Sequence, residues 1–153
     1  MTARAVIDST CFIALEHIEQ LELIPRLFQQ VYAPPAVVDE IGGAPGWLLV
    51  QRVGNESLLK ALRTQLDEGE SAVIALAAEL ENSVLVLDDK KARRLGREMG
   101  LRVVGTVGLL LRAKRENMVP EVKSLLERLV EGGFRLSREL HREAIRLAGE
   151  DSG

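Results

Sequence analysis

The stretch SVLVLDDKKARRLGREMGLRVV, residues 83–104, decides the fold class of this chain. Residues 83–87 form a short apolar run, which predicts a buried strand. Residues 90–99 have a helical composition that Gly100 ends, and residues 101–104 are a second short apolar run. Two strands joined by a helix form a β-α-β unit, in which the strands are parallel and the crossover is right-handed. The chain is therefore expected to be an α/β protein with a parallel sheet.

The rest of the chain alternates in the same way. No internal repeat, low-complexity tract or long linker divides it, so we expect one domain over residues 1–153, with the C-terminal helices 120–149 included. Residues 47–53 are ambiguous between strand and helix. Strands are expected at 4–7 and 31–33, and helices over 11–15, 21–30, 35–41, 57–66, 70–81, 107–116, 120–131 (with Pro120 in its first turn) and 138–148 (with Ser137 as its cap).

Composition bounds the class of protein. The chain has 153 residues, of which 46% are hydrophobic and only 3% aromatic, so its core must consist mainly of aliphatic side chains. The single Cys11 cannot form an internal disulfide, and we see neither a secretory leader nor an apolar stretch near the roughly 20 residues that span a bilayer. We expect a soluble, cytoplasmic protein without a membrane partner.

Five acidic residues fall where an α/β domain gathers functional groups. Asp8 and the pair Asp88-Asp89 each follow an expected strand, whereas Glu40 and Glu70 border the apolar stripes of expected helices. Taken singly, each acid is explained equally well as a turn, cap or exposed helix residue. Together at one sheet edge they would repel one another and their pKa values would rise, unless a cation joined them.

The donor chemistry narrows the kind of cation. Carboxylate oxygens select Mg²⁺ or Mn²⁺, and a chain with two histidines and one cysteine has too few ligands for a typical zinc site. A hard divalent ion lowers the pKa of a bound water and stabilises charge on a phosphodiester. These residues therefore point to metal-assisted phosphoryl chemistry.

Five segments carry a resemblance to a known family. They are residues 6–10 (VIDST), 33–41 (APPAVVDEI), 67–77 (DEGESAVIALA), 86–89 (VLDD) and 104–110 (VGTVGLL). In this order and spacing they resemble the PIN-domain family, and within it the small prokaryotic proteins related to the VapC-like toxin ribonucleases. The resemblance implies a three-layer α/β/α domain with a central parallel sheet, a nuclease site that uses Mg²⁺ or Mn²⁺, and commonly a homodimer.

The resemblance also assigns roles to the acids. Leu87 replaces the threonine of the family's threonine-x-aspartate pattern, so Asp88 stays a candidate beside Asp89 for the fourth acid. The expected catalytic and metal-binding residues are Asp8, Glu40, Glu70, Asp89 and Asp88.

Basic residues directly follow the acidic pair. Residues 90–97 contain five bases and no acid, although the formal net charge of the chain is −3. Such a run is often only a solvated helix face, but beside carboxylates it suits phosphates that flank a cleaved bond. We expect RNA contacts from Ser9, Lys90, Lys91, Arg93 and Arg94.

The leading interpretation is a metal-dependent endoribonuclease that cleaves RNA with a metal-activated water, as the toxin of a toxin–antitoxin pair with an antitoxin protein as its partner. The alternative is a non-catalytic PIN-like module that binds RNA or protein. An aspartate-phosphorylating phosphatase is disfavoured, because Thr10 stands where its pattern needs a second aspartate. A receiver domain is disfavoured, because its acidic pair would be near the start of the chain and not at Asp88-Asp89.

Other residues have simpler interpretations. His17 and His141 are expected to be structural or exposed, Cys11 to be a buried small hydrophobe, and Trp47 to belong to the core or an interface. The glycines at positions 105 and 108 fit either a phosphate-binding turn or an ordinary strand-to-helix turn, with Thr106 first a cap residue.

Overall fold

The computed structural model describes residues 3–151, in which five parallel strands form one sheet. The strand order is β3-β2-β1-β4-β5, and every neighbouring pair is parallel. This confirms the α/β fold with a central parallel sheet. The strands are β1 (Arg4–Ile7), β2 (Gln30–Ala33), β3 (Leu48–Val50), β4 (Ser83–Val86) and β5 (Arg102–Val104).

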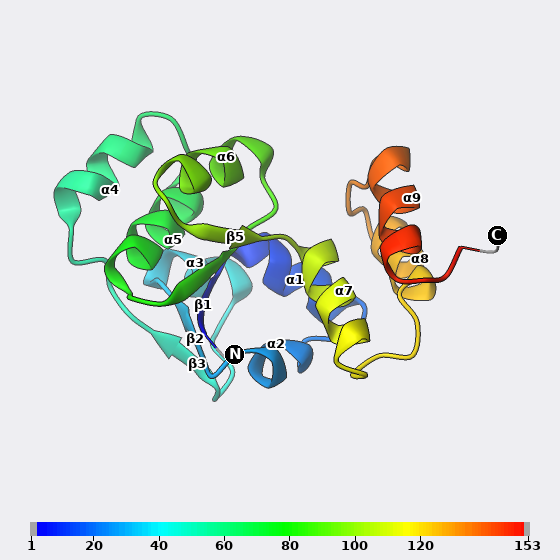
Figure 1. Cartoon of the computed structure of the whole chain (residues 1–153). Helices are drawn as coiled ribbons and strands as arrows, with labels where there is room; N and C mark the ends of the chain where they lie inside the picture. Colours follow the sequence, from blue (N-terminus) through cyan, green and yellow to red (C-terminus); the bar gives the residue numbers. More distant parts are fainter. Residues whose placement is uncertain (1–2, 152–153) are drawn as a thin grey trace.

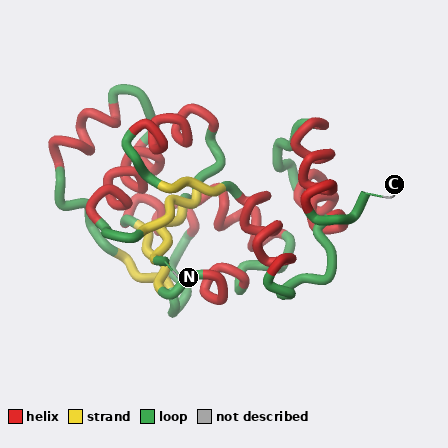
Figure 2. Tube along the Cα trace, viewed as in Figure 1, coloured by secondary structure: helices red, strands yellow, loops and turns green. Residues whose placement is uncertain are grey.

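Helices flank this sheet. In Figure 1, α4, α5 and α6 lie on one side of the strands and α1, α2 and α7 on the other, and Figure 2 shows the strands enclosed between helices. Helices α8 and α9 lie near the C-terminus (Figure 1), where α8 contacts α1 and α9 contacts α7. The helices are α1 (Ser9–His17), α2 (Leu23–Leu27), α3 (Pro35–Ile41), α4 (Glu56–Arg63), α5 (Glu68–Glu79), α6 (Lys90–Glu98), α7 (Thr106–Arg115), α8 (Lys123–Glu131) and α9 (Arg138–Leu147).

The sheet reverses its winding at β1. From β1 the chain moves outward to β2 and β3, then returns to β4 on the opposite flank and continues to β5. Ligand sites of open α/β sheets form at such a switch point, outside the carboxyl ends of the strands. Asp8 and Asp88, which follow β1 and β4, both lie there.

The core is aliphatic, as the composition predicts. Ile7 of β1, Leu85 of β4 and Ile74 of α5 are fully buried, and they belong to one continuous hydrophobic cluster. Helix α5 packs against both β1 and β4. The central strands are thus held rigidly behind the acids that follow them.

Two predicted helices differ from the structure, and one segment that the sequence left ambiguous is a strand. Residues 47–53 contain the edge strand β3. The helix expected over 21–30 is limited to α2, because the N–H of Gln29 donates to the Ala3 carbonyl, and this bond starts the pairing of β2 with β1. Helix α8 begins at Lys123, so Pro120 lies before it and not in its first turn. Ser137 caps α9, as expected, by accepting the Leu140 N–H.

Across residues 3–151, every helix is too short or too polar to cross a membrane.

Candidate functional site

Three of the predicted acids, Asp8, Glu40 and Glu70, lie close together beyond the carboxyl end of β1, and we call this cluster the acidic edge. Asp8 is its centre. It directly follows β1 and is the N-cap of α1, and its N–H donates to the Val86 carbonyl at 3.0 Å, which fixes its position against β4. The residue is only 5% exposed. Burial raises the pKa of Asp8 from 3.8 to about 7; hydrogen bonding to the Ser9 backbone opposes this rise, and the charges of Glu70 and Glu40 add to it. Asp8 is therefore a buried acid whose ionised form lacks a counter-charge.

Gly69 makes room for two carboxylates beside each other. It lies in the first turn of α5, and a Cβ at this position would lie 2.6 Å from Glu40 Oε1 and 3.6 Å from Asp8 Oδ1. The Ser9 hydroxyl donates to Glu40 Oε1 at 3.2 Å. Glu40 comes from α3, so α1, α3 and α5 meet at this point. Ser9 is thus placed to orient an acid; no contact in the structure addresses its predicted role with RNA.

Glu70 directly follows Gly69 in the chain and is half-buried. Its N–H donates to Asp67 Oδ1 at 2.8 Å, and its Oε1 accepts the Asp67 N–H at 3.4 Å, which together form a capping box. Burial raises the pKa of Glu70, and the charges of Asp67 and Asp89 raise it further. The sequence interpretation missed Asp67, although the spacing of Asp67 and Glu70 is the signal of a capping box.

Asp88 and Asp89 have different surroundings. Asp88 accepts the Thr106 N–H at Oδ1 (2.9 Å), and at Oδ2 it accepts the Thr106 hydroxyl (2.6 Å) and the Cys11 thiol (2.9 Å). Asp89 is exposed and is the N-cap of α6, where it accepts the Ala92 N–H at 3.0 Å. Both oxygens of Asp88 therefore already serve to hold α1 and α7 together, whereas Asp89 lies close enough to influence Glu70.

Cys11 and Thr106 contribute more to the site than the sequence indicates. Cys11 is fully buried, as expected, and burial, followed by the charge of Asp88, raises the pKa of its thiol well above 9.0. Thr106 is not the helix cap that the sequence favours: Gly105 is the N-cap of α7, and Asp88 supplies the capping oxygen from another element. No local sequence signal reveals a cap that comes from 18 residues away.

Close packing explains both glycines of this turn. A Cβ on Gly105 would lie 2.7 Å from Asp88 Oδ1 and 2.7 Å from Arg93 Nη1, and a Cβ on Gly108 would lie 2.6 Å from Val104 Cγ2. Because Asp88 already accepts the Thr106 N–H, that N–H is not available to a phosphate. The structure favours the ordinary strand-to-helix turn over a phosphate-binding turn.

The basic residues of α6 divide into two groups. Lys90, Lys91 and Arg94 are exposed, whereas Arg93 is half-buried with its guanidinium over Gly105. The exposed side chains form a charged helix surface beside the acids. Arg93 alone among the four reaches the neighbourhood of Asp88.

The carboxylates of Asp8, Glu40, Glu70 and Asp89 are suitable ligands for a divalent cation, but in the structure they do not surround a common point. Among residues 3–151, no three His, Cys, Asp or Glu side chains are spaced to hold a metal ion. Glu40 and Glu70 instead bind to Ser9 and Asp67. Oxygen-only donors around a carboxylate with a raised pKa suit a hard cation. To bind a cation together with Asp8, the side chain of Glu40 would have to turn away from the Ser9 hydroxyl, and that of Glu70 away from the Asp67 N–H.

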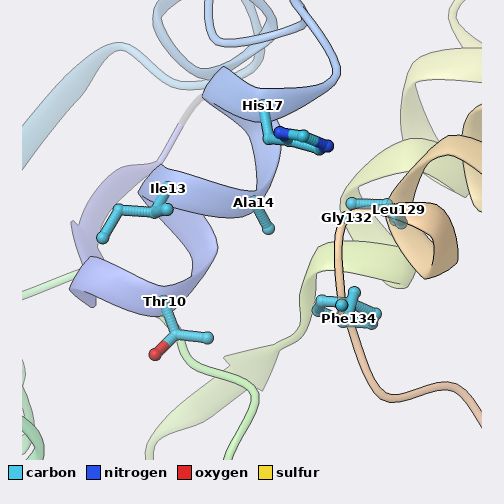
Figure 3. A pocket seen from close by; sticks show the side chains of 8 residues that line it. Thr10, Ile13, Ala14, His17, Leu129, Gly132 and Phe134 are labelled. Carbon is cyan, nitrogen blue, oxygen red and sulfur yellow. The ribbon is translucent and has the colours of Figure 1, made fainter.

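A separate cavity of about 310 Å³ lies between α1 and the segment that joins α8 to α9. Figure 3 shows His17 of α1 with its ring directed toward Gly132, and a Cβ on Gly132 would overlap that ring. The lining contains Ile13, Leu129 and Phe134 and no carboxylate. His17 therefore packs against the backbone of the C-terminal segment, in agreement with a structural role.

Comparison with known proteins decides the family. A family model described as PIN domain matches residues 4–150. The chain belongs to the PIN-domain family. PIN domains are in general nucleases, and they typically use divalent metal ions.

Among solved structures, this PIN domain is similar to a PilT N-terminus domain protein from the hyperthermophilic archaeon Sulfolobus solfataricus P2. The two share 19% sequence identity with a TM-score of 0.44, over 72% of this chain and 92% of the other. No curated protein matches this chain.

Proposed function

We propose that this PIN domain is an endoribonuclease in which Asp8, Glu40, Glu70 and Asp89 hold Mg²⁺ or Mn²⁺. The observation that carries the proposal is the position of Asp8, buried at the switch point of the sheet with Glu40 and Glu70 near enough to raise its pKa. A fold that keeps acids together in this way destabilises itself unless a cation binds.

The surroundings of each acid suggest its role. Asp89 is the better fourth ligand, because it is exposed and near Glu70, whereas Asp88 already accepts three hydrogen bonds. Asp88 is then a positioning residue that holds the start of α7. Ser9 orients Glu40 through its hydroxyl.

A bound divalent ion supplies an activated water and stabilises charge on the phosphodiester. The chain itself supplies ligand oxygens and exposed bases: Lys90, Lys91 and Arg94 lie on α6 directly after Asp89, where they can contact flanking phosphates. No nucleophilic side chain is required for this hydrolysis.

The proposed biological setting rests on the family resemblance. In it, residues 1–153 form a single PIN domain that acts in the cytoplasm as a toxin ribonuclease, assembles as a homodimer and is held in check by an antitoxin protein. Copurification with the product of an adjacent gene, together with the mass of the purified chain in solution, would test the partner and the homodimer.

The proposed activity is tested with the purified chain, labelled single-stranded RNA and Mn²⁺. Asp8→Asn should reduce the cleavage rate by about 100-fold or more, since it removes the central ligand. Asp39→Asn is the matched control, because Asp39 is exposed and adjacent to Glu40 in the chain. Equal Mn²⁺-dependent cleavage by the wild type and Asp8→Asn would contradict the proposal.

One observation favours the second candidate, a non-catalytic module that binds RNA or protein. Among the described residues, the acids are not spaced around a cation. Thermal unfolding with increasing Mn²⁺ separates the two candidates, because an ion that binds only the folded state stabilises it by about 2.7 kcal/mol at 100 times its Kd. A midpoint that rises in the wild type and not in Asp8→Asn supports the nuclease, and an unchanged midpoint supports the module.

A further inference from the structure

A cavity of about 280 Å³ opens beside Asp88. It lies between α6, β5, α7 and the segment that joins α8 to α9. Asp88 forms part of its wall, so the cavity begins where the acidic edge ends. We call it the Asp88 pocket; its lining includes Arg93, Val107, Leu111, Phe134, Arg135 and Leu140.

The Asp88 pocket carries positive charge at its rim. Arg93 is half-buried with its guanidinium over Gly105, and Arg135 is exposed on the segment between α8 and α9. Within residues 3–151, neither guanidinium forms an ion pair with a carboxylate. Asp88 lies near Arg93 across Gly105 and keeps its own charge, but its oxygens accept hydrogen bonds from Thr106 and Cys11 and not from Arg93. Two arginines are thus available to an anion.

The wall of the Asp88 pocket is apolar and includes one aromatic ring. Val107 and Leu111 come from one face of α7, while Phe134 and Leu140 come from the C-terminal segment. Leu140 is 44% exposed, although it is a large hydrophobic side chain. The volume of about 280 Å³ lies just below the range of small-molecule sites, which starts at about 300 Å³. A cavity of this size suits a small group and not a folded partner.

A nucleotide combines these two features. Its base is flat and largely apolar on its faces, and unpaired bases of RNA stack on aromatic rings and on guanidinium planes, while arginines bind the phosphates. The position beside Asp88 places such a nucleotide next to the acids, where the phosphodiester would be cleaved. Charge, size and location therefore indicate the same ligand.

We propose that the Asp88 pocket binds one unpaired base of the RNA substrate next to the cleaved phosphodiester. Phe134 contacts the base, and Arg93 and Arg135 bind the phosphates on either side of it. The inference rests on the proposed function, because it takes RNA as the substrate. It adds that the substrate is single-stranded at the cleaved position, since a base inside a duplex cannot enter the pocket.

Binding without cleavage is the first test. The probe is a fluorescein-labelled RNA dodecamer of mixed, unstructured sequence, followed by anisotropy in EDTA so that metal-dependent cleavage does not contribute. Phe134→Ala should weaken binding by about five- to 150-fold, the range for loss of one base–aromatic contact. Leu147→Ala is the matched control, because Leu147 is a large hydrophobic side chain of α9 that is 56% exposed and outside the pocket.

The arginines are tested in the same assay. Arg135→Ala and Arg93→Ala should each weaken binding and reduce its dependence on salt, whereas Arg138→Ala, an exposed arginine of α9 outside the pocket, should change neither. A duplex of the same sequence should bind no differently to the wild type and Phe134→Ala. Each variant is first checked for an unchanged thermal midpoint.

Photocrosslinking locates the base independently of any substitution. The same dodecamer with 4-thiouridine should attach to the tryptic peptides 129–135 and 103–112, which contain Phe134 and Val107. Adducts confined to other peptides, equal affinity of Phe134→Ala and Leu147→Ala, or no measurable binding of the dodecamer would overturn the inference.

The two proposals fail in distinguishable ways. RNA that crosslinks to peptide 129–135 but is not cleaved with Mn²⁺ would sink the nuclease and leave the Asp88 pocket as an RNA-binding site. RNA that is cleaved equally by the wild type and Phe134→Ala, without adducts on either peptide, would sink the pocket and leave the nuclease.

Discussion

Two carboxylates of this protein, Asp8 and Glu150, are both largely removed from water but have opposite surroundings. Asp8 is 5% exposed and lies near Glu40 and Glu70, and burial, with these charges, raises its pKa to about 7. The side chain of Glu150 is 11% exposed, and it accepts the N–H groups of Val122 (2.6 Å) and Lys123 (2.8 Å) and a bond from Lys114 Nζ (2.7 Å).

The pKa of Glu150 moves in the opposite direction. Burial alone would raise it, but the hydrogen bonds from Lys114 and from the backbone of Val122 and Lys123 outweigh burial and lower the pKa. Glu150 thereby supplies the capping oxygen that Val122, the N-cap of α8, lacks. Glu150 is therefore a carboxylate that stabilises the fold, whereas the ionised form of Asp8 destabilises it. A buried carboxylate with a raised pKa, such as Asp8, is a candidate for a functional site.

The pH dependence of stability should show the largest contrast. The pKa of Asp8 is higher in the folded state than its ordinary 3.8, so this group favours folding at low pH, and its contribution is lost as pH rises from about 4 through about 7. The loss is on the order of 4 kcal/mol by pH 8. Denaturant unfolding in EDTA at pH 5 and pH 8 should therefore show a smaller difference with pH for Asp8→Asn than for the wild type.

Asp39→Asn serves as the control for that measurement, because Asp39 is exposed. An identical pH profile for the wild type and Asp8→Asn would mean that the surroundings of Asp8 do not oppose its charge.

Removal of Glu150 should have the next largest effect on stability. It should destabilise the fold, because Glu150, unlike ionised Asp8, stabilises it. Glu150→Ala leaves two backbone N–H groups and Lys114 without their acceptor, which should lower the free energy of unfolding by about 2 kcal/mol near pH 7. Because the pKa of Glu150 is lowered in the folded state, this stabilisation is present above about pH 4.5 and is lost as pH falls through the folded value. Urea unfolding of Glu150→Ala measures this stabilisation, and Asp151→Ala, at the exposed neighbouring residue, is the control. An equal loss of unfolding free energy in the two variants would show that Glu150 does not cap α8.

Gly69→Ala should have the smallest effect and bears on the acidic edge alone. The new Cβ would lie 2.6 Å from Glu40 Oε1, so Glu40 must move and the affinity for Mn²⁺ should fall about tenfold, or about 1.4 kcal/mol. Without metal, the change should stabilise α5 by up to about 1 kcal/mol, because alanine favours helix. Calorimetric titration with Mn²⁺ checks the affinity; Gly46→Ala is the control, since a Cβ on Gly46 meets no atom within 4 Å. Unchanged affinity in Gly69→Ala would place the cation elsewhere.

Local patterns predicted most of the fold. The apolar runs at 4–7 and 83–87 and the cap at Ser137 correspond to β1, β4 and α9, because burial and capping depend on residues close together in the chain. The one shortened helix and the segment that stayed ambiguous, residues 47–53, depend on contacts between residues far apart in the chain. Helix α2 is short because Gln29 pairs with Ala3, and β3 exists because it can pair with β2.

The candidate site divides in the same manner. Asp8, Glu40 and Glu70 could be named from their positions after strands and beside apolar stripes. Asp67 was missed, and Asp88 could not be separated from Asp89, because their roles depend on contacts with residues outside their own segments. Thr106 and Cys11, which hold Asp88, are 18 and 77 residues away from it.

The sequence by itself determined the parallel α/β fold, the PIN-domain resemblance and the set of acids, since each follows from residue type and local spacing. Only the tertiary structure decided what each carboxylate does. Asp88 is held by hydrogen bonds, Glu150 caps a helix, and Asp8 is buried among like charges. The state of a carboxylate depends on the dipoles and charges around it, and in this protein those groups come from distant parts of the chain.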